Sequence, residues 1–281
     1  GLNGFGAYTI GKIQLNGENI RSLTLYPSQN NKGKPKRYTF YQTESQAALA
    51  YKLGEIDELT EMSSTSAGGN WGSMTVTEQV KYDRIVTLYF NMRVSELSDK
   101  NVRQGLAYAI PELPYERAGS PISKTSWAYT KNVRNFAHNP VEAKKLLANT
   151  FLATTSAELT LSTFPSYLDI AQHIASKWTD LGIKTTVKVE TSVPPDYQVL
   201  LSAQDLPPDP DQYPFWHSTQ TATNITGYVN VKIDKLLEDG RIELDQEKRK
   251  TIYSDFQRRL VEDAPAVFLY YPKLYSITRG K

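Results

Sequence analysis

A proline-rich segment, residues 205–219, holds the side chains of this sequence that are best suited to binding chemistry. Three aspartates, Asp205, Asp209 and Asp211, are followed within a few positions by Tyr213 and Trp216. The four prolines of the segment fix φ and remove backbone donors, which excludes a continuous helix or a central strand and predicts a stiff, extended loop. Such a loop presents carboxylates to cations and aromatic faces to flat groups. The alternative is a surface crossover whose aromatic residues cover a core.

These residue types form no recognisable catalytic arrangement. Asp209 and Asp211 lie two positions apart on extended backbone, so their carboxylates point to opposite sides instead of sharing one substrate bond. The three histidines, His138, His173 and His217, have no metal-ligand spacing, and no Gly-x-Ser-x-Gly nucleophile elbow is present. Cysteine is absent, which excludes disulfides, thiolate ligands and a Cys nucleophile. The sequence therefore predicts no enzyme activity, no metal site and no cofactor.

Composition narrows the possible partners. A chain of 281 residues is long enough for one large or two medium domains. Its net charge is +2 with lysine and arginine spread along the chain, so nucleic acid is not expected as a partner. No apolar run approaches the roughly 20 residues that span a bilayer. Tyrosine is frequent, at 18 residues, which is typical of binding surfaces.

Strands alternating with helices indicate an α/β fold. Capping residues predict helix starts at Thr43, at Ser98 or Asp99, and at Asn139, which precedes a proline. Further helices are expected at 167–181, 233–241 and 246–263, and apolar strands at 85–91, 158–163, 183–190, 197–201 and 266–271. Asp205 follows one of these strands, and α/β folds place ligands at the carboxyl ends of strands.

Blocks of sequence over nearly the whole chain carry a resemblance. They read Gly-Glu-Ile-Asp at 54–57, Leu-Tyr-Phe-Asn at 88–91, Val-Arg-Gln-Gly-Leu-Ala-Tyr-Ala-Ile at 102–110, Ser-Trp-Ala-Tyr at 126–129, Asp-Pro-Asp-Gln-Tyr at 209–213 and Asp-Ala-Pro-Ala-Val-Phe at 263–268. In this order they resemble the family 5 extracellular solute-binding proteins, the oligopeptide-binding receptors of ABC importers. The family is roughly twice as long as this chain, so the resemblance implies that an amino-terminal half is missing.

The resemblance implies an α/β, type II periplasmic-binding-protein-like fold, with one complete lobe and part of a second. Residues 1–87, continued by 269–281, would be the partial amino-terminal lobe, and residues 88–268 the carboxy-terminal lobe. The hinge strands would be those at 89–90 and 269–270. One departure from the family lies at 111–114, Pro-Glu-Leu-Pro, where the family continues its helix.

The function that the resemblance implies is that of the substrate-binding component of an ABC transporter, which binds extended peptides in an interlobe cleft for import. Its partners would be a peptide ligand, the membrane permease and the missing amino-terminal half. The location would be extracellular or periplasmic, with anchoring through an amino-terminal lipid absent from this chain. The alternative is a binding lobe repurposed as a protein-interaction module without transport.

The resemblance also suggests which residues bind. In the family an acidic residue of the loop commonly holds the peptide amino group, and Asp205 is the better match, with Asp209 second. The other reading of Asp209 is a turn role before Pro210. Four aromatic residues are expected either to line the cleft or to pack in the core: Trp127, Tyr129, Tyr213 and Trp216.

Overall fold

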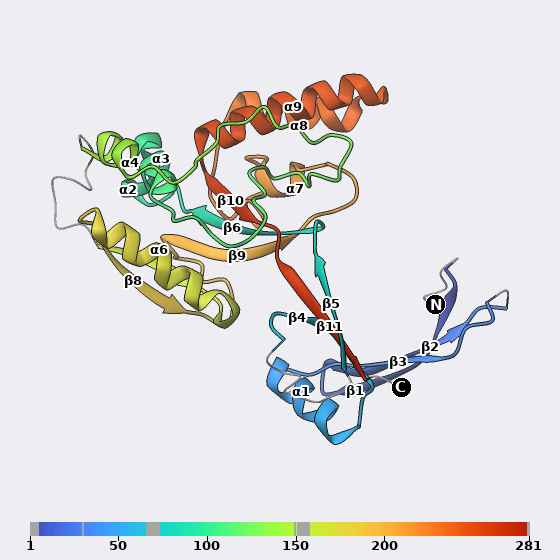
Figure 1. The fold of residues 1–281 in the computed structure, drawn as a ribbon. Coiled ribbons are helices and arrows are strands. Elements are labelled where there is room, and N and C mark those ends of the chain that lie inside the picture. The colour runs from blue at the N-terminus through green and yellow to red at the C-terminus, as the bar shows by residue number, and fades with distance from the viewer. Residues whose placement is uncertain (1–5, 30, 66–73, 149, 151–157, 280–281) are drawn as a thin grey trace. The chain divides into compact units, whose positions relative to one another are not determined.

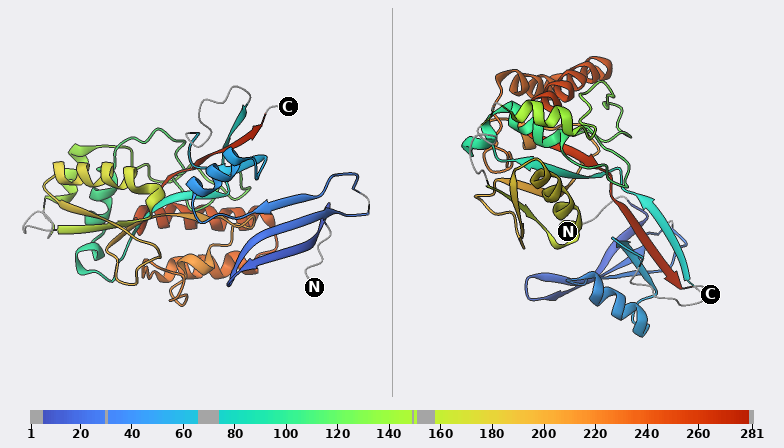
Figure 2. Two further views of the ribbon diagram at one scale, coloured as in Figure 1. Left: turned by 90° about the horizontal axis from the view of Figure 1, so that it is seen from below. Right: turned by 60° about the vertical axis from the view of Figure 1, so that its left-hand side comes forward.

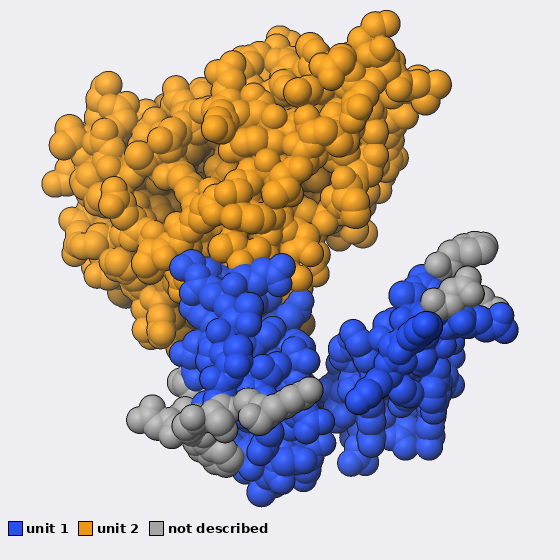
Figure 3. All heavy atoms as spheres, turned by 45° about the vertical axis from the view of Figure 1, so that its right-hand side comes forward, with its two compact units in different colours: residues 1–79, 273–281 blue, residues 80–272 orange. Residues whose placement is uncertain are grey.

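The computed structural model describes residues 6–29, 31–65, 74–148, 150 and 158–279. The chain forms two compact units, residues 80–272 and residues 1–79 with 273–281, which Figure 3 colours separately. The predicted lobes change instead at 87/88 and 268/269. The strands at those positions, β6 (Arg84–Phe90) and β10 (Ala266–Tyr270), pair with each other inside one sheet of the larger unit. That the smaller unit is part of an amino-terminal lobe stays a prediction.

The larger unit is built on a five-stranded sheet with the order β10-β6-β9-β7-β8. Its other strands are β7 (Glu158–Thr163), β8 (Lys184–Val189) and β9 (Val199–Asp205). β7 runs parallel to β8 and β9, whereas β6 runs antiparallel to β9 and β10. The carboxyl ends of β7 and β9 therefore share one edge of the sheet with the first residues of β6.

Helices cover both faces of this sheet (Figures 1 and 2). On one side lie α3 (Lys100–Tyr108), preceded by the short α2 (Ser95–Ser98), then α4 (Pro140–Leu147) and α6 (Leu168–Asp180), which follows a 3-10 turn at Pro165–Tyr167. On the other side lie α7 (Tyr213–Trp216), α8 (Val231–Ile242) and α9 (Gln246–Asp263). Trp178 of α6 is fully buried and donates its indole N–H to the Leu106 carbonyl of α3 at 3.1 Å.

Capping residues set where these helices begin. The Asp99 carboxylate accepts the Asn101 N–H at 2.8 Å, and the Asn139 side chain accepts the Glu142 N–H at 3.0 Å. Each bond satisfies a backbone donor that has no partner within its helix. The predicted start at Asn139 is confirmed, and of Ser98 and Asp99 it is Asp99 that caps α3.

The described residues of the smaller unit form two three-stranded sheets and one helix. β1 (Tyr8–Asn16), β2 (Asn19–Pro27) and β3 (Lys36–Thr39) form one sheet; β4 (Glu58–Met62), β11 (Lys273–Arg279) and β5 (Met74–Val80) form the other. The helix α1 (Glu44–Leu53) begins at the predicted cap Thr43 and ends at Gly54, whose φ of 79° suits glycine. Strands at β5 and β11 were not predicted from the sequence, and their residues are mostly exposed or half-buried.

The core of the smaller unit is small, and many of its apolar side chains face solvent. Four described residues form the buried cluster: Tyr51, Leu59, Met62 and Ile277. By contrast, Ile10, Ile13, Leu15 and Ile20 of β1 and β2 are 40–63% exposed. The sheet β1-β2-β3 thus leaves apolar surface uncovered within the described residues.

Candidate functional site: a sheet edge and a proline-rich turn

The six predicted ligand-binding residues all lie in the larger unit, but the structure does not gather them into one site. Asp205 ends β9 at the edge of the sheet, and Trp216 lies in the core. Asp209, Tyr213 and Trp127 lie near two arginines of α8 and α9. Tyr129 follows Trp127 in the irregular segment between α3 and α4, half-buried against the main core.

Asp205 presents an accessible carboxylate at the carboxyl edge of β9. Its side chain is 73% exposed, and its Oδ1 lies 2.5 Å from Nε of Arg84. Arg84 begins β6 and stands opposite Asp205 in the strand register. Pro207 and Pro208 follow after Leu206 and restrict the backbone, so the chain that carries the carboxylate has little freedom even without a ligand.

Asp209 and Asp211 instead fasten the turn to two helices. Both oxygens of Asp209 bind Arg249 of α9, at 2.9 and 2.7 Å, and Asp211 binds Arg241 of α8 at 2.7 Å. The hydrogen bonds from Arg249 lower the pKa of Asp209. Each carboxylate also accepts a backbone N–H two residues further on, Asp209 from Asp211 and Asp211 from Tyr213. The turn reading of Asp209 agrees with these contacts.

The sequence predicts an extended loop over the whole segment 205–219, but the structure differs in one part of it. Tyr213–Trp216 form one helical turn, α7, with Pro214 in its first turn. Proline is tolerated there because the first N–H groups of a helix have no partner within the helix. The four prolines therefore exclude a long helix but not this turn, and the expectation of an extended loop is wrong for these residues.

The candidate aromatic residues differ in burial. Trp216 is 1% exposed and packs between Tyr89 and Phe268, with ring centroids 6.5 and 6.0 Å away. Of the two readings left open for it, the structure supports core packing. Tyr213 and Trp127 are half-buried and each lies under a guanidinium: Arg241 is 3.9 Å from the Tyr213 ring, and Arg249 is 5.6 Å from the Trp127 ring.

Four residues near the Asp205 edge were not singled out from the sequence. Arg84 pairs with Asp205, and both charges act on the Tyr167 hydroxyl, whose pKa is raised mainly by burial. Tyr270 ends β10, and the ring of Tyr115 stacks on it with centroids 4.3 Å apart. These residues come from four separate segments, and periodicity within one segment does not show which strand ends meet.

Comparisons with known proteins agree with the resemblance. Residues 2–224 match the family described as "Bacterial extracellular solute-binding proteins, family 5 Middle". The oligopeptide-binding protein AppA of Bacillus subtilis (strain 168) is 28% identical over 223 residues, and the match covers 66% of this chain and 41% of AppA. The probable di/tripeptide-binding protein 5 of Pseudomonas aeruginosa (strain UCBPP-PA14) is 27% identical over 218 residues, and the match covers 67% of this chain and 40% of that protein. The chain thus spans about 40% of the length of these curated relatives.

Solved structures show the same fold. AppA from Bacillus subtilis in complex with a nonapeptide has a TM-score of 0.77 at 21% identity, over 98% of this chain and 62% of that chain. NikZ from Campylobacter jejuni in complex with Ni(L-His) has a TM-score of 0.82 at 22% identity, over 98% and 62%. The predicted fold, α/β and type II periplasmic-binding-protein-like, is confirmed.

The matched family consists of solute-binding proteins, which agrees with the prediction that this is not an enzyme. Within the described residues, no helix combines the length and apolar character needed to cross a membrane. The family match covers well over half of the chain. The chain therefore belongs to the family 5 bacterial extracellular solute-binding proteins.

Proposed function

We propose that the protein containing this chain is the substrate-binding component of an ABC importer and that it binds extended peptides. Two relatives are named as oligopeptide-binding and di/tripeptide-binding proteins, and one similar structure holds a nonapeptide. In the chain itself, the observation that carries the proposal is the accessible Asp205 carboxylate at the carboxyl edge of β9. Open α/β sheets bind their ligands at this edge.

Asp205 receives the ammonium group of the peptide's amino terminus. The carboxylate is held by the strand end before it and by the prolines after it, so it loses little conformational entropy on binding. Arg84 already balances its charge, so the incoming ammonium group shares the carboxylate with Arg84 or takes its place. An ammonium–carboxylate contact also discriminates against peptides whose amino group is blocked.

In the complete protein, the peptide lies in a cleft between this unit and a second lobe. The peptide stabilises the closed arrangement of the lobes by the difference between its affinities for the closed and open states. The membrane permease of the importer then recognises the closed state. This part of the proposal rests on the family and on the relatives' names.

Further polypeptide of the same protein, the amino-terminal half that the resemblance implies, covers the smaller unit. The exposed apolar side chains of β1 and β2 and the four-residue buried cluster support this. Amide hydrogen exchange tests it: protection of residues 8–27 should be higher in the complete protein than in the 281-residue chain. Equal protection in a monomeric chain would contradict it.

The protein works outside the cytoplasmic membrane, anchored by a lipid on a residue that precedes this chain. The family is one of extracellular solute-binding proteins, which supports the location. Radiolabelled fatty acid should be incorporated into the protein in its host if the anchor exists. A protein recovered unlabelled from the soluble extracellular fraction would remove the anchor from the proposal.

The deciding experiment is native mass spectrometry of the complete protein purified from its host, followed by calorimetric titration of the stripped protein with peptides. Co-purified peptides and measurable peptide binding are expected. An empty site together with a co-purified protein would overturn the proposal in favour of a repurposed interaction module, which the comparisons do not support.

A further inference from the structure

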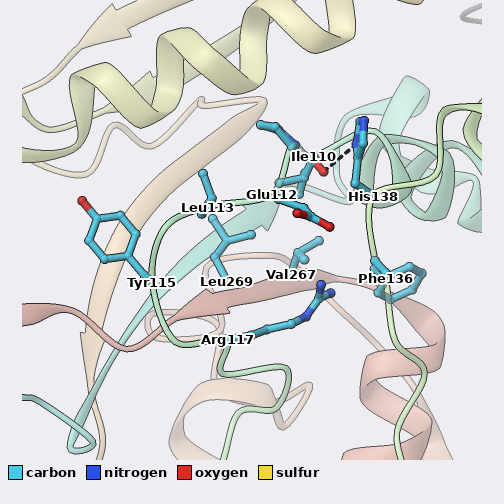
Figure 4. Close-up of a pocket in the computed structure, with 11 residues that line it drawn as sticks. Ile110, Glu112, Leu113, Tyr115, Arg117, Phe136, His138, Val267 and Leu269 are labelled. Atoms are coloured by element: carbon cyan, nitrogen blue, oxygen red, sulfur yellow. Dashed lines mark hydrogen bonds between the residues drawn. The ribbon is translucent and has the colours of Figure 1, made fainter.

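A cavity of about 250 Å³ lies beside β10 in the larger unit (Figure 4). Three segments form its wall: residues 110–117 after α3, residues 136–138 before α4, and β10. Leu113, Val267 and Leu269 supply apolar surface. The volume is below the roughly 300–1,000 Å³ of pockets that hold drug-sized ligands, so the cavity suits a group about the size of one amino-acid residue.

Pro111 and His138 hold the wall in shape. α3 ends at Tyr108, and Pro111 prevents the helix from continuing across the cavity. His138 Nδ1 lies 3.0 Å from the Ile110 carbonyl, which can only accept, so Nδ1 carries the proton and joins the first two wall segments. Arg117 forms an antiparallel backbone bridge with Tyr270, which joins the first segment to β10.

Within the described part of residues 80–272, Arg117 differs from the other arginines. Its guanidinium makes no hydrogen bond or ion pair with a described residue. The other arginines of this unit all bind carboxylates or carbonyl oxygens through their side chains: Arg84, Arg93, Arg103, Arg134, Arg241, Arg249, Arg258 and Arg259. Arg117 remains accessible, yet the surrounding protein lowers the pKa of its guanidinium by partial burial. An accessible guanidinium without a protein partner has free N–H donors for an incoming anion, and a carboxylate can accept two of them in parallel.

An acceptor stands near this donor. Figure 4 shows the ends of Arg117 and Glu112 both directed toward Val267, and no ion pair joins the two charges within the described residues. The cavity therefore offers donors for a carboxylate, an acceptor for an N–H group and an apolar wall for a side chain. The three features match the α-carboxylate, the α-nitrogen and the side chain of a single amino-acid residue.

We propose that this cavity is a ligand site for a residue with a free α-carboxylate, which binds Arg117 while the adjacent N–H donates to Glu112 and the side chain packs on Leu113 and Leu269. A free amino acid and the carboxy-terminal residue of a peptide share this chemistry. Tyr115 lines the cavity, and its ring stacks on Tyr270 at the edge of the sheet. A peptide whose last residue occupies the cavity can therefore extend to this edge. The inference does not require Asp205 to bind a peptide, because Asp205 does not line the cavity.

The test is a titration of the isotopically labelled 281-residue chain, followed by NMR chemical shifts. N-acetyl-leucine, which has the carboxylate and an amide N–H, should shift the amides of residues 110–117 and 267–269. N-acetyl-leucine amide, which lacks the charge, should bind about tenfold more weakly or worse, the loss expected for a charged hydrogen bond. Leucine binding more tightly than N-acetyl-leucine assigns the site to free amino acids, and the reverse order assigns it to peptide carboxyl termini.

Variants of single arginines test which side chain binds the carboxylate of N-acetyl-leucine. Arg117→Gln should weaken N-acetyl-leucine about tenfold or more, Arg117→Lys should retain part of the affinity, and Arg258→Gln, at an exposed ion pair on α9, should leave it unchanged. If Arg117→Gln fails to fold, the comparison of acid and amide on the unmodified chain still decides.

The inference is overturned if millimolar N-acetyl-leucine leaves residues 110–117 unshifted, or if the amide binds as well as the acid. Binding that survives Arg117→Gln in a folded protein would also overturn it. Failure of the proposed function gives a different pattern, since the chain would then bind N-acetyl-leucine through Arg117 while the complete protein ignores peptides.

Discussion

The two ends of the segment 205–219 lie in opposite environments, although they are close in sequence. The Asp205 side chain is 73% exposed at the edge of the sheet, whereas Trp216 is 1% exposed between two core rings. Between them, Asp209 is tied to α9. The segment therefore combines a carboxylate available to a ligand with an anchor that holds the turn in place.

Two carboxylate–arginine pairs of the segment differ in the same way, although both join an aspartate to an arginine. In the pair of Asp205 and Arg84 the two side chains are 73% and 31% exposed, whereas in the pair of Asp209 and Arg249 they are 55% and 19% exposed and Arg249 binds both carboxylate oxygens. A bidentate pair with a confined guanidinium is more rigid than a single contact at an edge. The first pair can exchange partners at little cost, and the second mainly fixes structure.

The largest expected effect is at the buried end. Trp216→Ala should reduce the free energy of unfolding by about 3–5 kcal/mol, because it leaves a large cavity between Tyr89 and Phe268. Urea unfolding of the 281-residue chain measures it. Trp127→Ala is the control, since Trp127 is half-buried and should lose less. Equal losses of unfolding free energy for the two variants would show that Trp216 is no more important to the core than the half-buried Trp127.

The next effect is at the accessible end. Asp205→Asn in the complete protein should weaken peptides with a free amino terminus by about 30-fold or more, since truncating one partner of a desolvated charge pair costs roughly 2–5 kcal/mol. Amino-terminally acetylated peptides should bind almost unchanged. Calorimetric titration measures both.

Asp209→Asn is the matched control for ligand binding, and it should affect affinity much less. If Asp209→Asn abolishes binding while Asp205→Asn does not, the peptide amine is held at the turn. The assignment of Asp205 to ligand binding and of Asp209 to structure would then be wrong. If neither variant matters, the ligand is not held by its amine, and the peptide proposal loses its main support.

Local patterns predicted the elements that position this segment. The expected helix at 246–263 is observed at Gln246–Asp263, and the expected strand before Asp205 is observed but extends to Asp205 itself. Caps and apolar periodicity are read within a few neighbouring residues, so one sequence is sufficient to locate them.

Contacts between distant residues could not be predicted in this way. Arg249 lies 40 positions after Asp209, and nothing in the spacing selects it over the other arginines. Trp127 and Trp216 both come from stretches of sequence without apolar periodicity, so their burial depends on how separate segments meet. The cavity at Arg117 likewise exists only where three segments come together.

A smaller effect concerns stability at the turn. Asp209→Asn should lower the free energy of unfolding by about 1 kcal/mol, because it removes a bidentate pair whose carboxylate is partly exposed and screened. Asp205→Asn should cost less in the same urea experiment. A larger loss at Asp205 than at Asp209 would mean that the edge pair, not the turn, carries the structural role.

The smallest effect is the pH dependence of that loss, and its sign follows from the pKa shift. Arg249 lowers the pKa of Asp209 in the folded state, whereas the pKa of an aspartate in an unfolded chain is about 3.9. The folded chain therefore holds fewer protons at this site, so the stabilisation is present above the unfolded pKa and is lost as pH falls through the folded pKa.

Asparagine does not titrate, so the stability gap between the unmodified chain and Asp209→Asn should stay constant from neutral pH to about pH 5 and shrink below about pH 4. Urea unfolding at several pH values measures the gap. Arg249→Gln removes the cause of the shift, so adding Asp209→Asn to it should give a much smaller pH-dependent gap. A gap that stays level down to pH 3 would show that the Arg249 pair does not stabilise the ionised carboxylate, and the contrast with Asp205 would then rest on exposure alone.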